Sequence, residues 1–347
     1  MNNPKINIAM IAEKAGVSRA TVSRVLTNRG YVSAKTQQKV LEIMDSLHYV
    51  PNMMARGLAT GKLNIVALLA DLSNPYFMEM LLAMSGELQE SGYLVTLLNL
   101  ETGMEHESFE KALAFGYSGI VVVDPCPDER FSALLASSLC PVVLANRNAD
   151  YFEACDSAVI DNRMGGYLAT RHLLQLGHRR IAHVRGGPGS KASAERYKGY
   201  AQALEEYGLP LDEAITGQAV FTPEQGEKFG YRILDNHPDV TAIFAGNDYL
   251  AIGVINACKH RGKRVPEDLS VFGINSTPYS GTGLIGLTCI QQPFKPMGLH
   301  VGKYLIERME GGGGERAHAV LTPELLLRET TCPPAEASRR GSTKRVL

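Results

Sequence analysis

Two arginines near the N-terminus, Arg19 and Arg24, have the side-chain type and the spacing to bind base edges in DNA. A guanidinium group offers two parallel N–H donors, which match the O6 and N7 acceptors of guanine. Ala20 offers only a methyl group, which suits contact with a thymine methyl. When a helix enters the major groove N-terminus first, Arg19 and Ala20 meet the bases and Arg24 lies about one turn further along. We therefore predict that Arg19, Ala20 and Arg24 contact bases.

Four polar residues nearby are better suited to the phosphate backbone. Hydroxyl, amide and phenol groups donate hydrogen bonds to phosphate oxygens, and such contacts set the docking angle without reading the sequence. The four residues predicted to do this are Thr21, Ser23, Asn28 and Tyr31.

The distribution of charge agrees with a polyanionic partner at this end of the chain. The 347 residues carry a formal net charge of −1. Residues 1–62 hold nine basic and three acidic side chains, so this segment has a net charge of +6 and the remainder sums to −7. Because phosphate neutralisation depends on local charge, the basic segment indicates nucleic-acid binding. A basic face that is merely solvated is the alternative interpretation.

A second set of residues with binding chemistry follows short apolar runs further along the chain. Carboxylate and amide groups with aromatic neighbours suit a hydroxyl-rich ligand better than a phosphate. Each polar member could instead cap a helix, and Asp248 is predicted to cap the helix that follows it. The residues that we predict to bind a small molecule are Tyr76, Phe77, Asp124, Asn146, Arg147, Arg196, Phe221, Asn247, Asn275 and Phe294.

The N-terminal arginines need a helix-turn-helix unit to position them. Apolar residues recur at helical spacing between Asn7, a capping residue, and Gly16, a residue that ends helices. Ser18 can cap a second helix and Ser33 a third. Residues 1–51 are therefore predicted to form a three-helix headpiece whose second helix reads DNA.

The second set needs an α/β body. Amphipathic helices alternate with β-rich apolar runs, which read IVALLA, YLVTLL, GIVVV, PVVLA, RIAHV, TAIFA and LSVFG. This alternation predicts parallel sheets, with ligands at the carboxyl ends of the strands. This number of strands, each with a crossover helix, is too large for one compact lobe. We predict an N-terminal lobe of residues 63–161 and 293–330, a C-terminal lobe of residues 162–292, and a cleft between them.

Two further segments connect or follow these units. Residues 52–62 contain helix formers interrupted by glycines, in a stretch too short to be helical alone in water. We predict a hinge that becomes ordered on DNA. Residues 331–347 have almost no apolar content and are predicted to be a disordered tail.

The headpiece and hinge resemble those of the LacI/GalR repressor family. The resemblance rests on IAEKAGVSRATVSRVLTNRGYVSAKTQQKVLEIMDSLHYVPNMMARGL and returns in DLSNPYF, LGHRRIAHV, ERYKGYAQAL, TAIFAGNDYLAIGVINA and RVPEDLSVFGI. It implies a body like that of periplasmic binding proteins, and a minor-groove role for Ala55 and Leu58, with Leu58 as a wedge between base pairs. It also implies effector contact for Tyr76, Phe77, Asn146, Arg196, Phe221, Asn247 and Asn275.

The chain departs from the family pattern at two places. Met10 stands where the family usually has an acidic residue, which removes half of a capping box. Asn275 and Ser276 stand where the family usually has two carboxylates. The loss of a carboxylate removes a charge-assisted acceptor for ligand hydroxyls, so no particular sugar is transferred from a relative.

Two other classes of function are compatible with an α/β body. A solute-binding protein of a transport system would share the two lobes, but the headpiece and a polar N-terminus without a signal peptide oppose it. An enzyme is opposed because the chain has no phosphate-binding glycine motif and no His/Cys cluster with metal spacing. His178, His183 and His237 are interpreted as structural or surface residues. We expect no enzymatic activity, no cofactor and no metal.

Together these patterns predict a transcription regulator, a repressor, that binds double-stranded operator DNA as a homodimer or a tetramer. A small-molecule effector, a sugar or sugar derivative, would control it allosterically from the cleft. The six cysteines are scattered, as in reduced cytoplasmic proteins, and no apolar run has membrane-spanning length. We therefore expect a bacterial cytoplasmic protein associated with the nucleoid.

Overall fold

The computed structural model of the protein describes residues 6–27, 30–50, 63–101, 103–125, 129–146, 155–187, 189–277, 280–281 and 285–335. In these segments no helix is long and apolar enough to cross a lipid bilayer. The predicted hinge, residues 52–62, lies outside the described residues.

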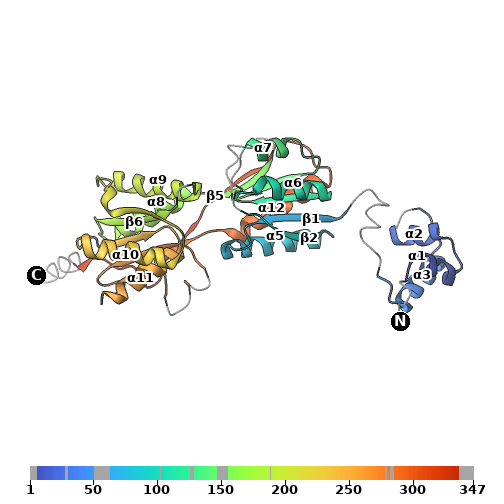
Figure 1. The fold of residues 1–347 in the computed structure, drawn as a ribbon, viewed down its shortest axis with the longest axis horizontal. Coiled ribbons are helices and arrows are strands. Elements are labelled where there is room, and N and C mark those ends of the chain that lie inside the picture. Colours follow the sequence, from blue (N-terminus) through green and yellow to red (C-terminus); the bar gives the residue numbers. More distant parts are fainter. Residues whose placement is uncertain are drawn as a thin grey trace, which may run out of the picture.

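Three short helices form the headpiece (Figure 1): α1 (Ile8–Ala15), α2 (Arg19–Thr27) and α3 (Ala34–Ser46). The predicted caps are confirmed, because the Asn7 side chain accepts from two backbone N–H groups of α1 and Gly16 ends that helix with a φ of 65°. The Ser33 side chain likewise accepts from the Thr36 N–H at the start of α3. All three helices contribute to one small core, made of Ile11, Ala12, Ala15, Val22, Val40 and Met44.

Two six-stranded sheets form the body in the part of the chain that the structure describes. The first contains, in spatial order, β11 (His318–Leu321), β5 (Asp156–Ile160), β4 (Val142–Ala145), β3 (Gly119–Val123), β1 (Ile65–Ala70) and β2 (Leu94–Asn99). The second contains β12 (Glu324–Leu326), β10 (Cys289–Gln291), β9 (Ser270–Asn275), β8 (Ala242–Ala245), β6 (Ile181–Gly186) and β7 (Thr216–Ala219). Every pairing is parallel except that of β12 with β10.

Helices cover both faces of each sheet, which confirms the predicted α/β class. We call each sheet with its helices a lobe. The first lobe includes α5 (Met78–Glu90), α6 (Glu105–Phe115), α7 (Glu129–Ala136), α12 (Phe294–Met309) and the short helix η1 (Pro75–Phe77). The second lobe includes α8 (Asn162–Gln175), α9 (Lys191–Glu206), α10 (Pro223–Asn236), α11 (Asp248–His260) and η3 (Glu213–Ile215).

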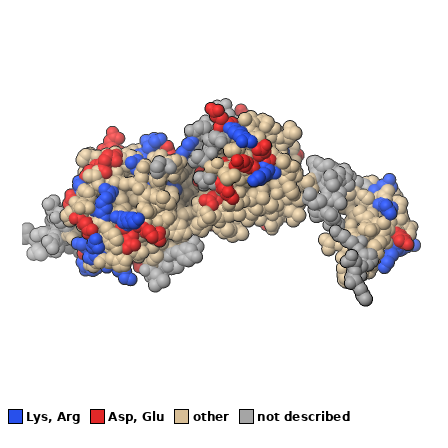
Figure 2. Space-filling model, viewed as in Figure 1, with Lys and Arg blue, Asp and Glu red and all other residues tan. Residues whose placement is uncertain are grey.

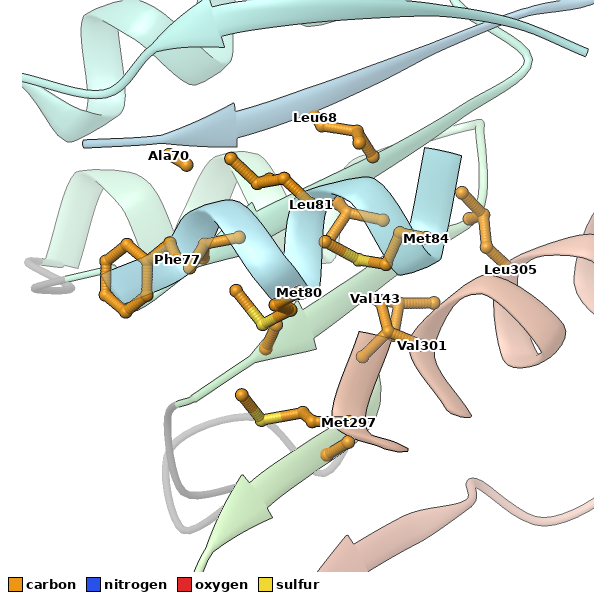
Figure 3. Close-up of a cluster of buried hydrophobic side chains, with 14 of the residues drawn as sticks. Leu68, Ala70, Phe77, Met80, Leu81, Met84, Val143, Met297, Val301 and Leu305 are labelled. Atoms are coloured by element: carbon orange, nitrogen blue, oxygen red, sulfur yellow. The ribbon is translucent and has the colours of Figure 1, made fainter. Parts of the chain in front are cut away.

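The pairing of α5 with α12 returns the chain to the first lobe after the second lobe is complete. Figure 3 shows Met80 and Met84 of α5 pointing toward α12 and the strands, where they meet Met297 and Val301. The helices approach closely at Gly298, where an added Cβ would lie 2.4 Å from the Met80 carbonyl oxygen. Residues far apart in sequence thus share one core.

The last strand corrects the predicted lobe boundary. β11 pairs with β5 in the first sheet, but β12 crosses back and pairs antiparallel with β10 in the second. Leu325 and Leu326 explain the crossing, because they pack into the cores on opposite faces of the second sheet. The assignment of all residues up to 330 to the N-terminal lobe was therefore wrong from β12 onward.

The start of the predicted tail is also corrected. The Cys332 carbonyl oxygen accepts hydrogen bonds from His178 Nε2 at 2.9 Å and from Ser270 Oγ at 3.1 Å. Cys332 therefore lies against the second lobe, where it supplies the acceptor that a buried histidine and a buried serine need. Residues 336–347 lie outside the described part of the chain.

Candidate functional site

The outer face of α2 carries the residues predicted to contact bases. Val22 is buried in the headpiece core, while Arg19, Ala20 and Arg24 are exposed. The turn into α2 is fixed by the Thr21 N–H, which donates to Ser18 Oγ at 3.0 Å. Figure 2 shows basic side chains on the surface of the headpiece. The helix therefore presents two guanidinium groups and a methyl group to the outside.

The structure describes only some of the residues predicted to contact phosphates and the minor groove, and these differ in exposure. Tyr31 is 91% exposed, Ser23 is half-buried, and Thr21 shares a hydrogen bond with the Ser18 hydroxyl at 2.9 Å. Asn28, Ala55 and Leu58 lie outside the described residues. The structure thus leaves Tyr31 accessible in the segment between α2 and α3. The predicted hinge contacts stay predictions.

A cleft of about 390 Å³ lies between the two lobes. Its size falls in the range of small-molecule sites. Both lobes contribute, because the carboxyl ends of β1, β3, β4, β8 and β9 meet there. Its walls are made of Asp71, Ser73, Asn74, Pro75, Tyr76, Phe77, Asp124, Asn146, Ser190, Ala192, Arg196, Val220, Phe221, Asn247, Tyr249, Asn275, Gln292 and Phe294.

The structure brings nine of the ten residues predicted to bind a small molecule to this one cleft. The tenth, Arg147, lies outside the described residues. The wall residues outside the predicted set are Asp71, Ser73, Asn74, Pro75, Ser190, Ala192, Val220, Tyr249 and Gln292. Gln292 follows the short strand β10, and Ser190 caps α9, so the same strand-end and capping signals could have found both.

Arg196 is the cationic group of the cleft wall. Its Nε donates to Asn162 Oδ1 at 2.9 Å and its Nη1 donates to the Gly246 carbonyl oxygen at 2.8 Å. Burial lowers the pKa of Arg196 to about 10, against the opposing influence of Tyr76, Asp124 and Asp248. The guanidinium is therefore charged at neutral pH and held in one direction.

Tyr76 connects the two lobes across the cleft. Asn247 Nδ2 donates to the Tyr76 hydroxyl oxygen at 3.3 Å, and the ring of Tyr76 lies 5.5 Å from the ring of Tyr249. Burial raises the pKa of Tyr76 far above its usual value, and the charge of Asp248 adds to this effect. The phenol therefore stays protonated and can donate a hydrogen bond.

The predicted cap of α11 was wrong by one residue. Asn247 is the N-cap, because its Oδ1 accepts from the Leu250 N–H at 2.9 Å. Asp248 is instead fully buried in the first turn, where it accepts hydrogen bonds from Thr277 and Ser280. A carboxylate at this depth needs such donors, and local sequence does not show that they are near.

Three cleft residues have backbone conformations that L-residues seldom adopt. Asp124, Asn146 and Asn275 have φ values of 47°, 59° and 116° at the ends of β3, β4 and β9. Asp and Asn tolerate the left-handed region better than other side chains. Each such conformation still costs of order 1–3 kcal/mol, so the surrounding structure must hold these residues in place.

The chemistry of the cleft suits binding of a polar, uncharged molecule. Among the described wall residues, the charged side chains are Asp71, Asp124 and Arg196, and carboxamides and aromatic rings supply most of the rest. The ring of Phe221 lies directly over Gly186, where an added Cβ would be 2.3 Å from it. Within the described segments, no group of three His, Cys, Asp or Glu side chains is placed to hold a metal ion.

The predicted resemblance is confirmed by comparison with known families. Residues 7–52 match the family described as bacterial regulatory proteins, lacI family. Residues 170–331 match the periplasmic binding protein-like domain.

Individual proteins agree with this. The HTH-type transcriptional regulator DegA of Bacillus subtilis (strain 168) is 35% identical over 335 residues, which is 95% of this chain and 99% of DegA. The solved complex of the transcriptional regulator CelR with cellobiose is 30% identical, covers 94% of this chain and 100% of that one, and has a TM-score of 0.71. The lac repressor dimer bound to operator and the anti-inducer ONPF is 26% identical, covers 94% of this chain and 99% of that one, and has a TM-score of 0.85. These relatives are transcription regulators and not enzymes. Since the similarity spans both the headpiece and the body, the chain belongs to the lacI family of bacterial regulatory proteins.

Proposed function

We propose that this protein is a repressor whose binding to a specific operator is controlled by a sugar or sugar derivative in the interlobe cleft. The observation that carries the proposal is that one chain combines a helix with exposed Arg19 and Arg24 and a polar, aromatic cleft shared by two lobes. Two relatives support it, because one solved structure is a complex with cellobiose and another is a dimer on operator DNA.

DNA recognition would be divided among three groups of residues. Arg19 and Arg24 bind guanines and Ala20 contacts a thymine methyl in the major groove. Thr21, Ser23, Asn28 and Tyr31 would fix the docking angle on the phosphates. Ala55 and Leu58 would enter the minor groove, where Leu58 unstacks a base step and bends the duplex.

A carbohydrate fits the cleft better than an anionic metabolite. Asp71 and Asp124 are acceptors for hydroxyl groups, and the carboxamides of Asn146 and Asn247 can both donate and accept. The ring of Phe221 offers an apolar face for the C–H side of a sugar ring. Among the described wall residues the two carboxylates outweigh Arg196, so a phosphate group would meet repulsion from them. We propose that no cofactor takes part.

We propose a homodimer that forms through the exposed face of α5 and β2. Met78 and Leu82 on α5, and Leu94 and Leu97 on β2, are all more than 40% exposed. β2 is an edge strand, and apolar edge strands are usually covered in native proteins. Figure 2 shows few charged side chains over this part of the first lobe. A two-fold dimer presents two α2 helices to two half-sites of an operator.

The effector would act by changing how the lobes meet. Tyr76 on the first lobe and Asn247 on the second bond across the cleft, so a molecule that enters there contacts both lobes. A ligand that favours one lobe arrangement changes the spacing of the two hinges in the dimer, and couplings of this kind amount to about 1–3 kcal/mol. Release of operator by an inducer is the arrangement we propose, in the bacterial cytoplasm at the nucleoid.

Two measurements test the proposal. Selection from random duplexes should yield a near-palindromic site that the protein prefers over bulk DNA at physiological ionic strength. A thermal-shift screen with a carbohydrate library that includes cellobiose should give a saturable shift, because ligand at 100 times its Kd adds about 2.7 kcal/mol of stability. A protein that shows no preference for any duplex, with or without these compounds, would overturn the proposal.

A further inference from the structure

The turn that follows Asn275 is held by hydrogen bonds to the carboxylate of Asp248, which does not itself line the cleft. Asp248 is fully buried, and its Oδ2 accepts from the Thr277 N–H at 2.7 Å, the Thr277 hydroxyl at 2.9 Å and the Ser280 hydroxyl at 2.6 Å. Ser280 is also fully buried. Because three donors bond to one carboxylate oxygen, these charge-assisted hydrogen bonds hold the turn strongly.

Arg328 also bonds to this turn. Arg328 Nη2 donates to the Ser276 hydroxyl at 2.8 Å, while its Nη1 donates to the Leu287 carbonyl oxygen at 2.7 Å. Arg328 follows β12, the strand that crosses from the first lobe. The two residues after Asn275 are therefore fixed by side chains from two different elements.

These hydrogen bonds adjoin a strained stretch of backbone. Asn275 and Ser276 have consecutive φ values of 116° and 60°. Neither residue is glycine, and L-residues resist this region. Without the bonds to Thr277 and Ser280, nothing in the local sequence favours keeping Asn275 in this conformation, at the wall of the cleft.

The same carboxylate stands next to the residues that join the lobes. Asp248 is the first residue of α11, between Asn247, which bonds to Tyr76 of the first lobe, and Tyr249, whose ring contacts Tyr76. The turn with Asn275 is thereby tied to the end of α11 that faces the first lobe.

We propose that Asp248 is a positioning residue for effector binding: its bonds to Thr277 and Ser280 hold Asn275 in a strained conformation and so place the Asn275 amide in the cleft. The inference rests on the proposed function only in assuming that a ligand occupies the cleft. It explains how a chain with an amide where the family usually has a carboxylate retains an ordered polar wall at this position.

Asp248→Asn is the variant that tests this. A neutral carbonyl is a weaker acceptor for three donors, and Oδ1 of Asp248 is buried without a hydrogen-bond partner among the described residues, so either orientation of the amide is unfavourable. In the ligand-free crystal structure of the variant, Asn275 should leave its positive φ. If Asn275 kept its conformation and its place in the cleft, the proposal would be wrong. This measurement needs no ligand, so it remains decisive even if no carbohydrate binds and the proposed function fails.

A double-mutant cycle supplies the functional measurement. The probe is the carbohydrate that gives the wild-type protein a saturable thermal shift. Asp248→Asn should lower its affinity about 10-fold in the wild-type background but change it less than about 2-fold in the Asn275→Ala background, because no amide is left to position. Equal losses in both backgrounds would show a merely structural role and reject the proposal.

Two controls complete the design. Asp235→Asn removes an exposed carboxylate that pairs with Arg261 at 2.7 Å, and it should change neither affinity. If Asp248→Asn does not fold, Ser280→Ala removes one of the three hydrogen bonds to Asp248 without adding a buried amide. This variant should give the same non-additivity with Asn275→Ala at a smaller magnitude, and additive losses would again reject the proposal.

Discussion

Arg196 shows how one side chain can serve both the fold and a ligand. It joins α9 to Asn162 at the start of α8 and to Gly246 beside α11, and it lines the cleft. Arg196→Ala should therefore abolish the carbohydrate-dependent thermal shift, because it removes a charged donor and leaves its partners unpaired. Operator affinity without ligand should be retained, since the headpiece has its own core. Isothermal titration and operator binding measure the two effects.

The matched control for Arg196 is Arg130→Ala. Arg130 pairs with Glu110 on the surface of the first lobe at 3.3 Å, with both side chains more than half exposed. Removing it should leave the thermal shift and the operator affinity unchanged. A full carbohydrate response in Arg196→Ala would place the ligand elsewhere.

Arg19 permits an equally direct test of base reading. Arg19→Ala should weaken binding to the selected operator by about 10–100-fold, because a bidentate contact with guanine is lost. Binding to random DNA should change much less, because random DNA loses only the contribution of one charge and no specific base contact. Fluorescence anisotropy with both duplexes measures the ratio. Equal losses on the two duplexes would remove Arg19 from the set that reads bases.

Buried histidines make stability depend on pH. His183 is fully buried, stacks on Phe244 at 4.4 Å between ring centroids, and has its pKa lowered to about 4 by burial. The unfolded chain binds this proton near pH 6.5 and the folded chain does not. The free energy of unfolding should therefore fall between pH 6.5 and 4, by about 3 kcal/mol for this residue.

Urea unfolding at pH 7 and pH 4.5 measures this loss. His183→Phe keeps the stacking and removes the titrating group, so its stability should fall less with acid than that of the wild-type protein. His300→Gln, at an exposed position of α12, should behave like the wild type. An unchanged pH dependence in His183→Phe would assign the effect to other groups.

Single residues of the cleft were predictable where the chain gives a local signal. Asn146, Asn247 and Asn275 each stand at the end of a β-rich run, and parallel strands bring such ends together. The role of Asp248 was not predictable, because its partners Thr277 and Ser280 follow a different strand. Nothing in the sequence next to Asp248 encodes that contact.

At the scale of elements, close helix pairs position the cleft residues. In the α8–α9 pair, an added Cβ on Gly166 would lie 2.0 Å from the Arg196 carbonyl oxygen, and one on Gly199 would lie 2.0 Å from the Arg163 carbonyl oxygen. The α10–α11 pair has the same reciprocal contact at Gly226 and Gly253. The backbone that carries Arg196 is thus set by glycines on the two helices.

Gly199→Ala should separate α8 from α9. A methyl group cannot fit against a backbone oxygen at this distance, and overpacking of this kind costs about 1–3 kcal/mol. The urea midpoint should fall, and carbohydrate affinity should fall with it because Arg196 moves. Gly313→Ala meets no atom within 4 Å and should change neither quantity. Wild-type stability in Gly199→Ala would contradict the tight packing of this pair.

The sequence predicted which segments form helices and strands better than it predicted which strands pair. Short β-rich apolar runs indicated the strands, and helical spacing with capping residues indicated the helices, because these are local signals. The pairing of β12 with β10 depends on Leu325 and Leu326 entering cores built from distant helices. A terminal strand of three residues carries no local signal of which sheet it will join.

At the scale of the whole molecule, the described segments cross between the lobes three times, and a buried ion pair fixes the last crossing to the first lobe. The crossings follow β5, β10 and β11. Asp156 is 1% exposed and binds Arg308 of α12 through two hydrogen bonds of 2.8 Å, and it also accepts from the Ala317 N–H just before β11. The strand that crosses back to the second lobe therefore starts from a fixed point.

The proposed dimer face can be tested by a substitution whose effect depends on assembly. Leu82 on α5 is 66% exposed in the single chain, so Leu82→Lys should change the stability of a monomer by less than about 0.5 kcal/mol. In a dimer that covers this face, the same change buries unpaired charge and opposes assembly. Analytical ultracentrifugation should then give the mass of one chain for the variant and of two for the wild type. Affinity for the palindromic operator should fall toward that for a single half-site, because the second headpiece is no longer held beside the first. Leu139→Lys, at a fully exposed position of the same lobe, should assemble and bind as the wild type does. If Leu82→Lys kept the mass of two chains and full operator affinity, the two copies would have to meet through another surface.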